Sequence, residues 1–145
     1  MSDKVINTEF RRVFPHFAER LSAHGLETLL KNCSRVEFRS GRNIVRDKMP
    51  TDAIYFVISG DASIFVEEDE RTIALGNIHS GQLLGEVSIL SRQMTASSTV
   101  QANSDMVTLK LKHQPLENLL TSDDTGPVLL QLLSEILASR LRVTH

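Results

Sequence analysis

Apolar residues recur every three or four positions through the first third of the chain. They are Val5, Ile6, Phe10, Val13, Phe14, Phe17, Leu21, Leu26, Leu29 and Leu30. This period predicts two or three short helices between about residues 3 and 33, one of them starting after Pro15. Gly25 is expected to separate two of these helices, and residues 26–32 to form a short amphipathic helix.

The period changes to two from Arg35 onward, which predicts strands. Val36 and Phe38 alternate with polar neighbours, and Gly41 supplies a turn before residues 43–46. Residues 53–59 are apolar at successive positions and rich in β-branched and aromatic residues, so a central strand with both faces covered is expected. Further strands are predicted at residues 62–66, 72–75, 98–102 and 106–112, with turns at 68–70, 76–77, 80–81 and 103–105.

Two helices are predicted near the C-terminus. Residues 113–120 form a short one, and Pro127 suits the first position of a longer one that ends near residue 142. The apolar residues of the longer helix span an arc of about 180°, whereas one supporting surface needs a stripe of about 100°. These residues are Leu129, Leu130, Leu132, Leu133, Ile136, Leu137 and Leu141. A homodimer through helix 127–142 is the preferred explanation, and deep burial of the helix against its own domain is the alternative.

The elements together predict a mainly β fold with flanking helices: an antiparallel β-roll or jelly roll with N-terminal helices and a long C-terminal helix. One domain over residues 1–145 is expected, with helices at about 3–33, the roll at about 35–112 and C-terminal helices at about 113–142. The composition, with 41% hydrophobic and 23% charged residues, is that of a packed globular protein.

The segment from residue 83 to residue 102 carries the strongest functional signal. It reads Leu-Leu-Gly-Glu-Val-Ser-Ile-Leu over residues 83–90 and Thr-Ala-Ser-Ser-Thr-Val-Gln-Ala over residues 95–102. It resembles the phosphate-binding cassette of the cyclic nucleotide-binding domain family, in which Gly-Glu, an aliphatic run and a short loop precede Arg and two small residues. Residues 54–60 look like the signature strand and turn of that family, and Gly81 looks like the glycine before its cassette.

The resemblance implies a ligand site built from both ends of this segment: Leu84, Gly85, Glu86, Val87, Ser88, Thr95, Ala96, Ser97 and Ser98. A short helix beginning near Gly85 would direct backbone N–H groups at a cyclic phosphate, and a glycine lets the ligand approach the main chain closely. Glu86 matches the family's acidic residue, which accepts hydrogen bonds from the ribose 2′-hydroxyl, and Ser97 matches a residue that contacts phosphate or purine. The implied ligand is cAMP or another cyclic nucleotide, with no further cofactor.

The sequence departs from the family pattern at the phosphate-binding arginine. This arginine falls on Ala96, or on Thr95 if the loop differs by one residue. Since a charge-assisted hydrogen bond contributes about 1.5–3 kcal/mol, its loss predicts binding weaker by roughly tenfold to more than a hundredfold. Arg92 in the intervening loop is one candidate substitute, and the hydroxyls of residues 95 and 97–99 are another source of hydrogen bonds.

Catalytic and metal chemistry have little support in the sequence. The histidines (His16, His24, His79, His113 and His145) are scattered, so a cupin-like metal site is not expected, and no P-loop or hydrolase motif occurs. Cys33 is the one cysteine, which excludes an internal disulfide. The acidic residues 67–70 are predicted to form a solvated hairpin tip.

The net charge and the length of the chain limit the partners that can be expected. The net charge is −2, without the basic excess of a nucleic-acid-binding surface, and the chain ends where the transcription factors of this family append a helix-turn-helix domain. Direct DNA binding is therefore not expected. The sequence has neither the apolar run of a signal peptide nor that of a membrane span, which predicts a cytoplasmic protein without a membrane partner.

Three hypotheses of function remain. The leading one is a non-enzymatic sensor domain, in which ligand binding near Gly85, Glu86 and Ser97 repositions the C-terminal helix and alters the interface with an unidentified downstream protein. The second is a degenerate roll that serves protein association without a nucleotide, and Ala96 favours it. The third is a changed ligand, such as a cyclic dinucleotide or a neutral metabolite.

Overall fold

The computed structural model describes residues 3–143, and for Asp3 and residues 141–143 the backbone alone. The chain forms two compact units. One contains the residues up to Cys33 together with those from Lys112 onward, and the other contains Ser34–Leu111. A single domain over residues 1–145 stays a prediction, and Met1, Ser2, Thr144 and His145 lie outside the described residues.

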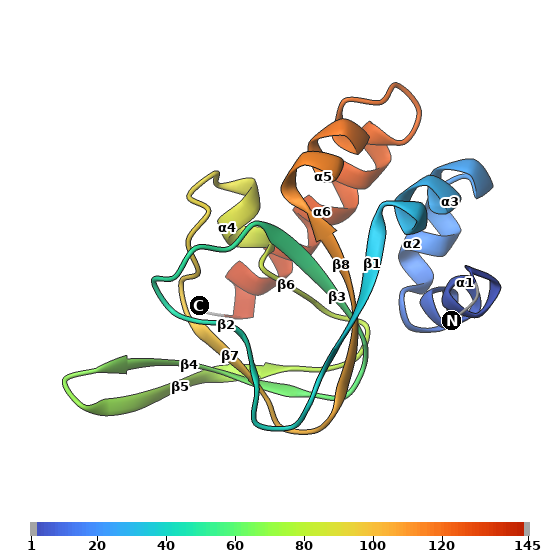
Figure 1. The fold of residues 1–145 in the computed structure, drawn as a ribbon. Coiled ribbons are helices and arrows are strands. Elements are labelled where there is room, and N and C mark those ends of the chain that lie inside the picture. Colours follow the sequence, from blue (N-terminus) through green and yellow to red (C-terminus); the bar gives the residue numbers. More distant parts are fainter. Residues whose placement is uncertain (1–2, 144–145) are drawn as a thin grey trace. The chain divides into compact units, whose positions relative to one another are not determined.

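The helical unit is built from the two ends of the chain. Its helices are α1 (Asp3–Val13), α2 (Pro15–Arg20), α3 (Ala23–Lys31), α5 (His113–Leu120) and α6 (Gly126–Val143) (Figure 1). Phe10, Phe14 and Phe17 are buried at its centre, with ring centroids 4.9 Å apart for Phe10 and Phe14 and 5.8 Å apart for Phe14 and Phe17. The apolar period of the first third therefore marks the core face of α1 and α2.

Gly25 does not separate two helices, contrary to the prediction from the sequence. It lies inside α3, and its amide donates a hydrogen bond to the hydroxyl oxygen of Ser22 at 3.0 Å. This N-cap starts the helix at Ala23, because the serine oxygen satisfies an amide that has no partner in the first turn. The break falls at Leu21, whose backbone is extended (φ −79°, ψ 144°).

The long helix α6 covers only part of its apolar arc within this unit. Its buried apolar side chains are Leu129, Leu132 and Leu133. Leu130 is 49% exposed, Ile136 and Leu137 are half-buried, and the side chain of Leu141 lies outside the described residues. An apolar strip on α6 therefore stays accessible in the single chain.

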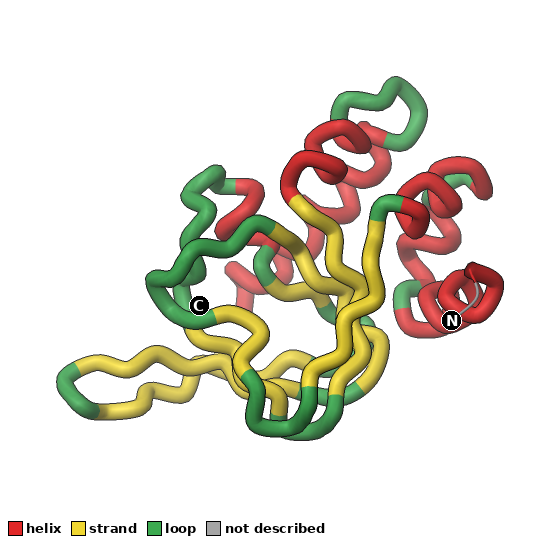
Figure 2. The backbone as a smooth tube through the Cα atoms, viewed as in Figure 1, coloured by secondary structure: helices red, strands yellow, loops and turns green. Residues whose placement is uncertain are grey.

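The strand unit consists of two four-stranded sheets (Figure 2). One has the order β1 (Cys33–Phe38), β8 (Met106–Lys112), β3 (Ala53–Ser59), β6 (Leu83–Leu84), and the other has the order β2 (Asn43–Val45), β7 (Thr99–Ala102), β4 (Ala62–Glu68), β5 (Arg71–Ile78). The pairs β2–β7, β4–β7, β4–β5 and β3–β6 are antiparallel. The predicted antiparallel β-roll with N-terminal helices and a long C-terminal helix is confirmed.

The core of the roll is supplied by both sheets. Its buried cluster contains Ile44, Ala53, Tyr55, Val57, Ala62, Ile78, Leu84, Val100, Ala102 and Met106. Residues 53–58 of β3 are buried at every position, as expected for a strand with both faces covered. The short strand β6, which pairs with β3 at Tyr55 and Phe56, was not predicted because two residues give no period.

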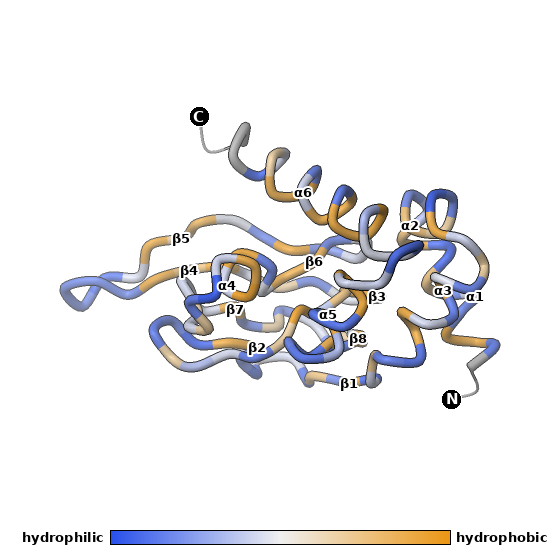
Figure 3. Tube along the Cα trace, turned by 90° about the horizontal axis from the view of Figure 1, so that it is seen from above, coloured by the Kyte–Doolittle hydropathy of each residue, from blue (hydrophilic) through white to orange (hydrophobic). Residues whose placement is uncertain are grey.

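The hairpin of β4 and β5 is longer than the sequence indicated. Gly76 and Asn77 do not form a turn: they lie inside β5, where Gly76 pairs with Ile64 and a bulge shifts the register between Ile64 and Phe65. The hairpin extends as an arm with a hydrophilic tip (Figures 1 and 3), at which Asp69 and Glu70 adopt φ values of 52° and 65°. Positive φ at both central residues is the hairpin turn whose twist matches that of the strands. The acidic residues 67–70 are all exposed, so the predicted solvated tip is confirmed.

Candidate functional site

Gly85 ends β6 and is the N-cap of α4 (Glu86–Leu90). Its φ is 90°, and a Cβ at this position would lie 2.6 Å from the carbonyl oxygen of Ala53. A glycine is therefore required by the left-handed backbone and by the neighbouring strand. This reason is independent of any ligand, whereas the sequence alone suggested close approach of a ligand as the cause.

Glu86 is the most deeply placed polar residue of the predicted site. Its exposed fraction is 0%, and that of Ser88, two residues further along α4, is 5%. Between them Val87 is 47% exposed. Burial of a carboxylate is costly unless polar or positively charged groups stabilise it, so such groups are expected around Glu86.

The loop after α4 returns alongside the segment that follows β2. The Met94 amide donates to the carbonyl oxygen of Ser88 at 3.2 Å, and the Thr51 amide donates to that of Met94 at 3.0 Å. The Ala96 amide donates to the carbonyl oxygen of Met49 at 2.9 Å, and Ala96 is itself 5% exposed. The position expected to hold the arginine is thus fixed by backbone pairing and filled by a buried methyl group.

Of the hydroxyl groups near Ala96, those of Thr95 and Thr99 make hydrogen bonds within the chain. Thr95 donates to the carbonyl oxygen of Gln93 at 3.2 Å, and Thr99 accepts a hydrogen bond from the Asp47 amide at 3.0 Å. Ser97, which is exposed, and Ser98, which is half-buried, make no side-chain hydrogen bond with the described residues. Of this group, Ser97 and Ser98 are therefore the hydroxyls available to a ligand.

The structure brings the predicted residues of the site together in part. Leu84, Glu86, Ser88 and Ala96 are buried, Gly85 and Ser98 are half-buried, and Val87, Thr95 and Ser97 are exposed. Arg92 is exposed and has a φ of 63°. Its amide donates to the carbonyl oxygen of Ile89, so its backbone belongs to the end of α4 rather than to residues 95–98.

An apolar surface on the β4–β5 arm was missed by the sequence analysis. Ile64 packs against the core cluster and pairs with Gly76, and two residues further along Val66 pairs with Ile73, so these positions share the core face of the sheet. On this face Ile73 is 40% exposed, and Leu75, which the bulge leaves without a pairing partner, is 56% exposed. A Cβ at Gly76 would meet no atom within 4 Å. The inner face of the roll is therefore open and apolar along the arm.

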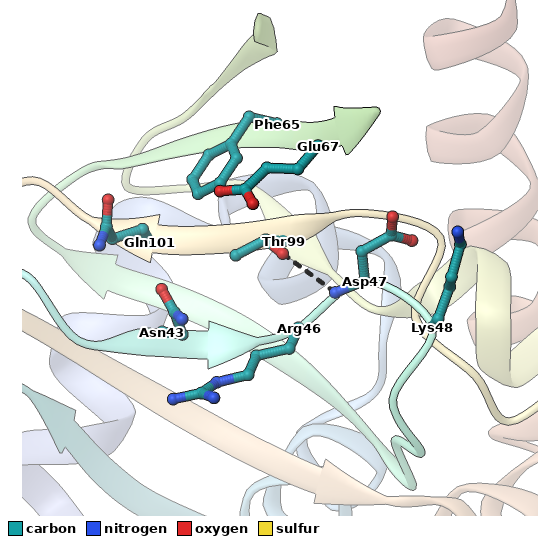
Figure 4. Close-up of a pocket in the computed structure, with 8 residues that line it drawn as sticks. All are labelled: Asn43, Arg46, Asp47, Lys48, Phe65, Glu67, Thr99 and Gln101. Carbon is teal, nitrogen blue, oxygen red and sulfur yellow. Dashed lines mark hydrogen bonds between the residues drawn. The ribbon is translucent and has the colours of Figure 1, made fainter. Parts of the chain in front are cut away.

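The opposite face of the same sheet has a cavity of about 420 Å³ (Figure 4). It is lined by Asn43, Arg46, Asp47, Lys48, Phe65, Glu67, Thr99 and Gln101. Thr99 and Gln101 alternate along β7 with the buried Val100 and Ala102, which places this cavity on the outer face. None of these residues was assigned to the site from the sequence, because polar residues that alternate along a strand are typical of a solvated face.

The comparisons with known proteins agree with this geometry. A sequence model described as the cyclic nucleotide-binding domain matches residues 35–123, which is more than half of the chain. The chain belongs to the cyclic nucleotide-binding domain family.

Relatives of known name lie within this family. The chain is similar to the CRP-like protein Clp of Xanthomonas oryzae pv. oryzae, with 26% identity over an alignment of 140 positions that covers 94% of the chain and 60% of Clp. It is also similar to the structure of the c-di-GMP-responsive global regulator CLP of Xanthomonas campestris, with a TM-score of 0.73 and 25% identity over 83% of the chain and 59% of CLP. A cyclic nucleotide-binding domain from Methylobacillus flagellatus has a TM-score of 0.84 at 16% identity, covering 94% of the chain and 80% of that domain. The last likeness concerns the fold alone.

The expectation that the chain takes no part in direct DNA binding is wrong. CLP is a global regulator that links cell–cell signalling to virulence gene expression, and the chain spans only 60% of the length of Clp. The net charge of −2 describes the 145 residues of this chain, whereas the charge that meets DNA in a regulator such as CLP can reside in the part of its length that the chain does not match. The net charge and the length of the chain therefore do not exclude a part in DNA binding.

Two further findings concern the described residues. In the described part of the chain, no helix is both long and apolar enough to cross a membrane. No group of three His, Cys, Asp or Glu side chains among residues 3–143 is placed to hold a metal ion, and His145 lies outside these residues.

Proposed function

We propose that the roll binds a cyclic nucleotide at its cassette and that the chain acts as a non-enzymatic, cytoplasmic sensor domain. The observation that carries this proposal is Glu86, a carboxylate with an exposed fraction of 0% directly after the left-handed Gly85. A buried carboxylate is stabilised by every hydrogen-bond donor that it meets. Ribose hydroxyls are donors of the right kind, which is the role that the family gives to this glutamate.

The phosphate of the ligand would be met by fewer donors than is usual in the family. Ser97 and Ser98 have hydroxyls without hydrogen bonds to the described residues, and Ala96 contributes no charge. Binding of cAMP is therefore expected to be weaker than in a family member with the arginine, by roughly tenfold to a hundredfold. Since CLP responds to c-di-GMP, a cyclic dinucleotide is the alternative ligand.

The response to the ligand would be conformational. A ligand shifts a protein between two arrangements only if it binds them with different affinity, and the proposed moving part is α6. The accessible apolar strip with Leu130 supports a homodimer through residues 127–142, in which a shift of α6 would alter the interface with a downstream protein.

A second candidate function is protein association without a nucleotide. Ala96 favours it, because its buried methyl group supplies neither charge nor hydrogen bond to a phosphate. In that case the roll would be a scaffold, and α6 would be its interaction surface.

Calorimetric titration of the full chain with cAMP, cGMP and c-di-GMP separates these functions. The sensor proposal expects saturable binding of one of these ligands, loss of binding in Glu86→Ala and strong weakening in the near-isosteric Glu86→Gln. Melting temperatures of both variants check that they fold. If the parent chain binds none of these ligands but Ala96→Arg does, the roll has lost its ligand. The scaffold function would then replace the sensor function.

A further inference from the structure

Lys48 has a backbone conformation that lysine rarely adopts. Its φ is 67°, in the left-handed region, where the side chain of any residue with a Cβ is disfavoured and glycine is not. Lys48 lies in a tight turn, in which the Met49 amide donates to the carbonyl oxygen of Arg46 at 3.0 Å. A glycine here would hold the turn at lower energetic cost, so the presence of lysine calls for a reason beyond the fold.

Lys48 is paired directly with Ala96. The Lys48 amide donates to the carbonyl oxygen of Ala96 at 2.8 Å, and the Ala96 amide donates to that of Met49 at 2.9 Å. Two residues of one segment thus face one residue of the other, which is a β-bulge whose first position is normally glycine. The strained lysine therefore stands opposite the residue at which the cassette lacks its arginine.

The side chain of Lys48 is exposed and forms no ion pair with any residue in the described part of the chain. Figure 4 shows it at one end of the outer-face cavity, beside the loop that leads into β7 and apart from Asn43 and Gln101. In this arrangement the ammonium group lies at the outer face, so a role at the cassette requires the flexible side chain, with its four methylene groups, to turn about the edge of the sheet. A compact, strongly hydrated cation of this kind binds phosphate as a point charge.

Arg92 is the competing cation, and its position is less favourable. It also has a positive φ, 63°, and it is also exposed. However, the Arg92 amide donates a hydrogen bond to the carbonyl oxygen of Ile89 at the end of α4. No backbone hydrogen bond among the described residues joins Arg92 to residues 95–98. The two residues therefore share charge, exposure and backbone strain, and they differ in their pairing with Ala96.

We propose that Lys48 supplies the positive charge for the phosphate of the bound cyclic nucleotide, in place of an arginine at position 96. This inference rests on the proposed function. It explains why a left-handed bulge position holds a lysine rather than a glycine.

The test compares Lys48→Gly with Arg92→Gly in the full chain. Each variant removes one positive charge from an exposed residue with positive φ, so the change in net charge and the relief of backbone strain are matched. Arg92 makes a further interaction with the chain, so the melting temperature of Arg92→Gly is measured as well. Lys48→Gly is expected to weaken binding of cAMP or c-di-GMP, whichever the parent binds, by roughly ten- to a hundredfold in calorimetry at fixed ionic strength. Arg92→Gly is expected to change it less than threefold.

The melting temperature adds a readout that a merely structural lysine would not give. Relief of the left-handed strain should leave the melting temperature of Lys48→Gly no lower than that of the parent. Lys48→Arg keeps the charge and is expected to retain binding within a few fold. If Lys48→Gly binds the ligand more weakly but is at least as stable as the parent, the loss of affinity is due to the missing charge.

Three outcomes overturn the proposal. Equal losses in Lys48→Gly and Arg92→Gly would show a general effect of net charge. Unchanged binding in Lys48→Gly, with binding still lost in Glu86→Ala, would reject the role of Lys48 and leave the sensor function standing. A parent chain that binds none of the ligands would reject the sensor function itself, and the role of Lys48 with it.

Discussion

Two constraints require a glycine at position 85: the left-handed backbone and the close carbonyl oxygen of Ala53. A pair of substitutions can separate their contributions to stability. Gly85→Ala would place a Cβ 2.6 Å from the carbonyl oxygen of Ala53 and would also strain a backbone with φ of 90°. Gly41 has a similar φ of 92°, but a Cβ there would meet no atom within 4 Å. Gly41→Ala therefore reports the backbone strain alone.

We expect Gly41→Ala to lower the free energy of unfolding by about 1–2 kcal/mol, and Gly85→Ala to lower it further, to about 3 kcal/mol or more. Urea denaturation of the two variants measures both values. Equal losses would mean that the strand next to Gly85 moves away at no cost.

Cys33 is predicted to be chemically inert in the folded chain. Cys33 is half-buried, and burial of its thiol raises the pKa from 9.0 to about 12. The thiolate is the reactive form. At pH 8 the thiolate is then rarer than in an unfolded chain, so alkylation by iodoacetamide should be slower by about tenfold or more. Mass spectrometry of the native and the urea-unfolded chain compares the rates, and a native rate within tenfold of the unfolded one would contradict the expected burial.

The sign of the effect on stability follows from the raised pKa. The folded chain holds the thiol proton more tightly, so the contribution of Cys33 to stability is complete below pH 9 and is lost as the pH rises through the folded value of about 12.

Residue identity could be judged from the sequence, but backbone conformation could not. The absence of an arginine at position 96 is visible in the sequence, and the structure adds that Ala96 is buried. The left-handed φ of Lys48 has no sequence signal, since the residue that marks such positions is glycine. The partner of Ala96 in a different part of the chain was therefore missed.

At the scale of elements, the turns at one end of the roll are tied together by side chains. Asp61 follows β3, and its carboxylate accepts hydrogen bonds from Ser104 at 2.9 Å and Asn103 at 3.2 Å, both in the loop between β7 and β8. Ser40, in the loop between β1 and β2, donates to the carbonyl oxygen of Asn103 at 2.9 Å. Three loops far apart in sequence thus share one network.

This network predicts a pH-dependent contribution to stability. Hydrogen bonds from Ser104 and then Asn103 lower the pKa of Asp61 below its ordinary value of 3.8. A lowered pKa means that the stabilisation is present above the pKa of the unfolded chain and is lost as the pH falls through the folded value. We expect Asp61→Asn to melt at a lower temperature than the parent at pH 7, and the difference to shrink as the pH approaches 3.

The hairpin tip offers the control for Asp61. Asp69→Asn changes an exposed residue with positive φ, a conformation that asparagine tolerates. Its melting temperature should follow that of the parent at both pH values. A gap between Asp61→Asn and the parent that persists unchanged to pH 3 would reject the role of the ionised carboxylate.

The elements that the sequence predicted well are those with a sustained period. Residues 53–59 and 106–112 match β3 and β8 in both bounds. Errors occurred where a single residue was taken as punctuation: Gly25 lies inside a helix because Ser22 caps it, and Gly76 lies inside β5 because a bulge accommodates it. In both cases a contact from another position decided the local structure.

At the scale of the whole molecule, the accessible strip on α6 predicts self-association. Leu130 is 49% exposed on a helix whose other leucines at 129, 132 and 133 are buried. We expect the chain to be a dimer in light scattering at micromolar concentration, and Leu130→Glu to shift it to monomer, because a buried unpaired charge opposes the interface. Gln131→Glu adds the same charge at the neighbouring exposed position and should leave the dimer intact. Identical behaviour of the two variants would mean that the strip is not the interface.

If the sensor mechanism is correct, dimerisation and ligand binding must be coupled with equal strength in both directions. A ligand that strengthens dimerisation by some factor must bind the dimer more tightly than the monomer by the corresponding factor, because one coupling free energy links the two equilibria. Leu130→Glu supplies the monomer for one side of this comparison, and sedimentation of the parent with and without saturating ligand supplies the other. We expect a difference of about fivefold or more in each, as is typical of coupled sites. A ligand that binds the monomer and the dimer with the same affinity cannot act through α6 at all, because equal affinity for two arrangements shifts neither of them.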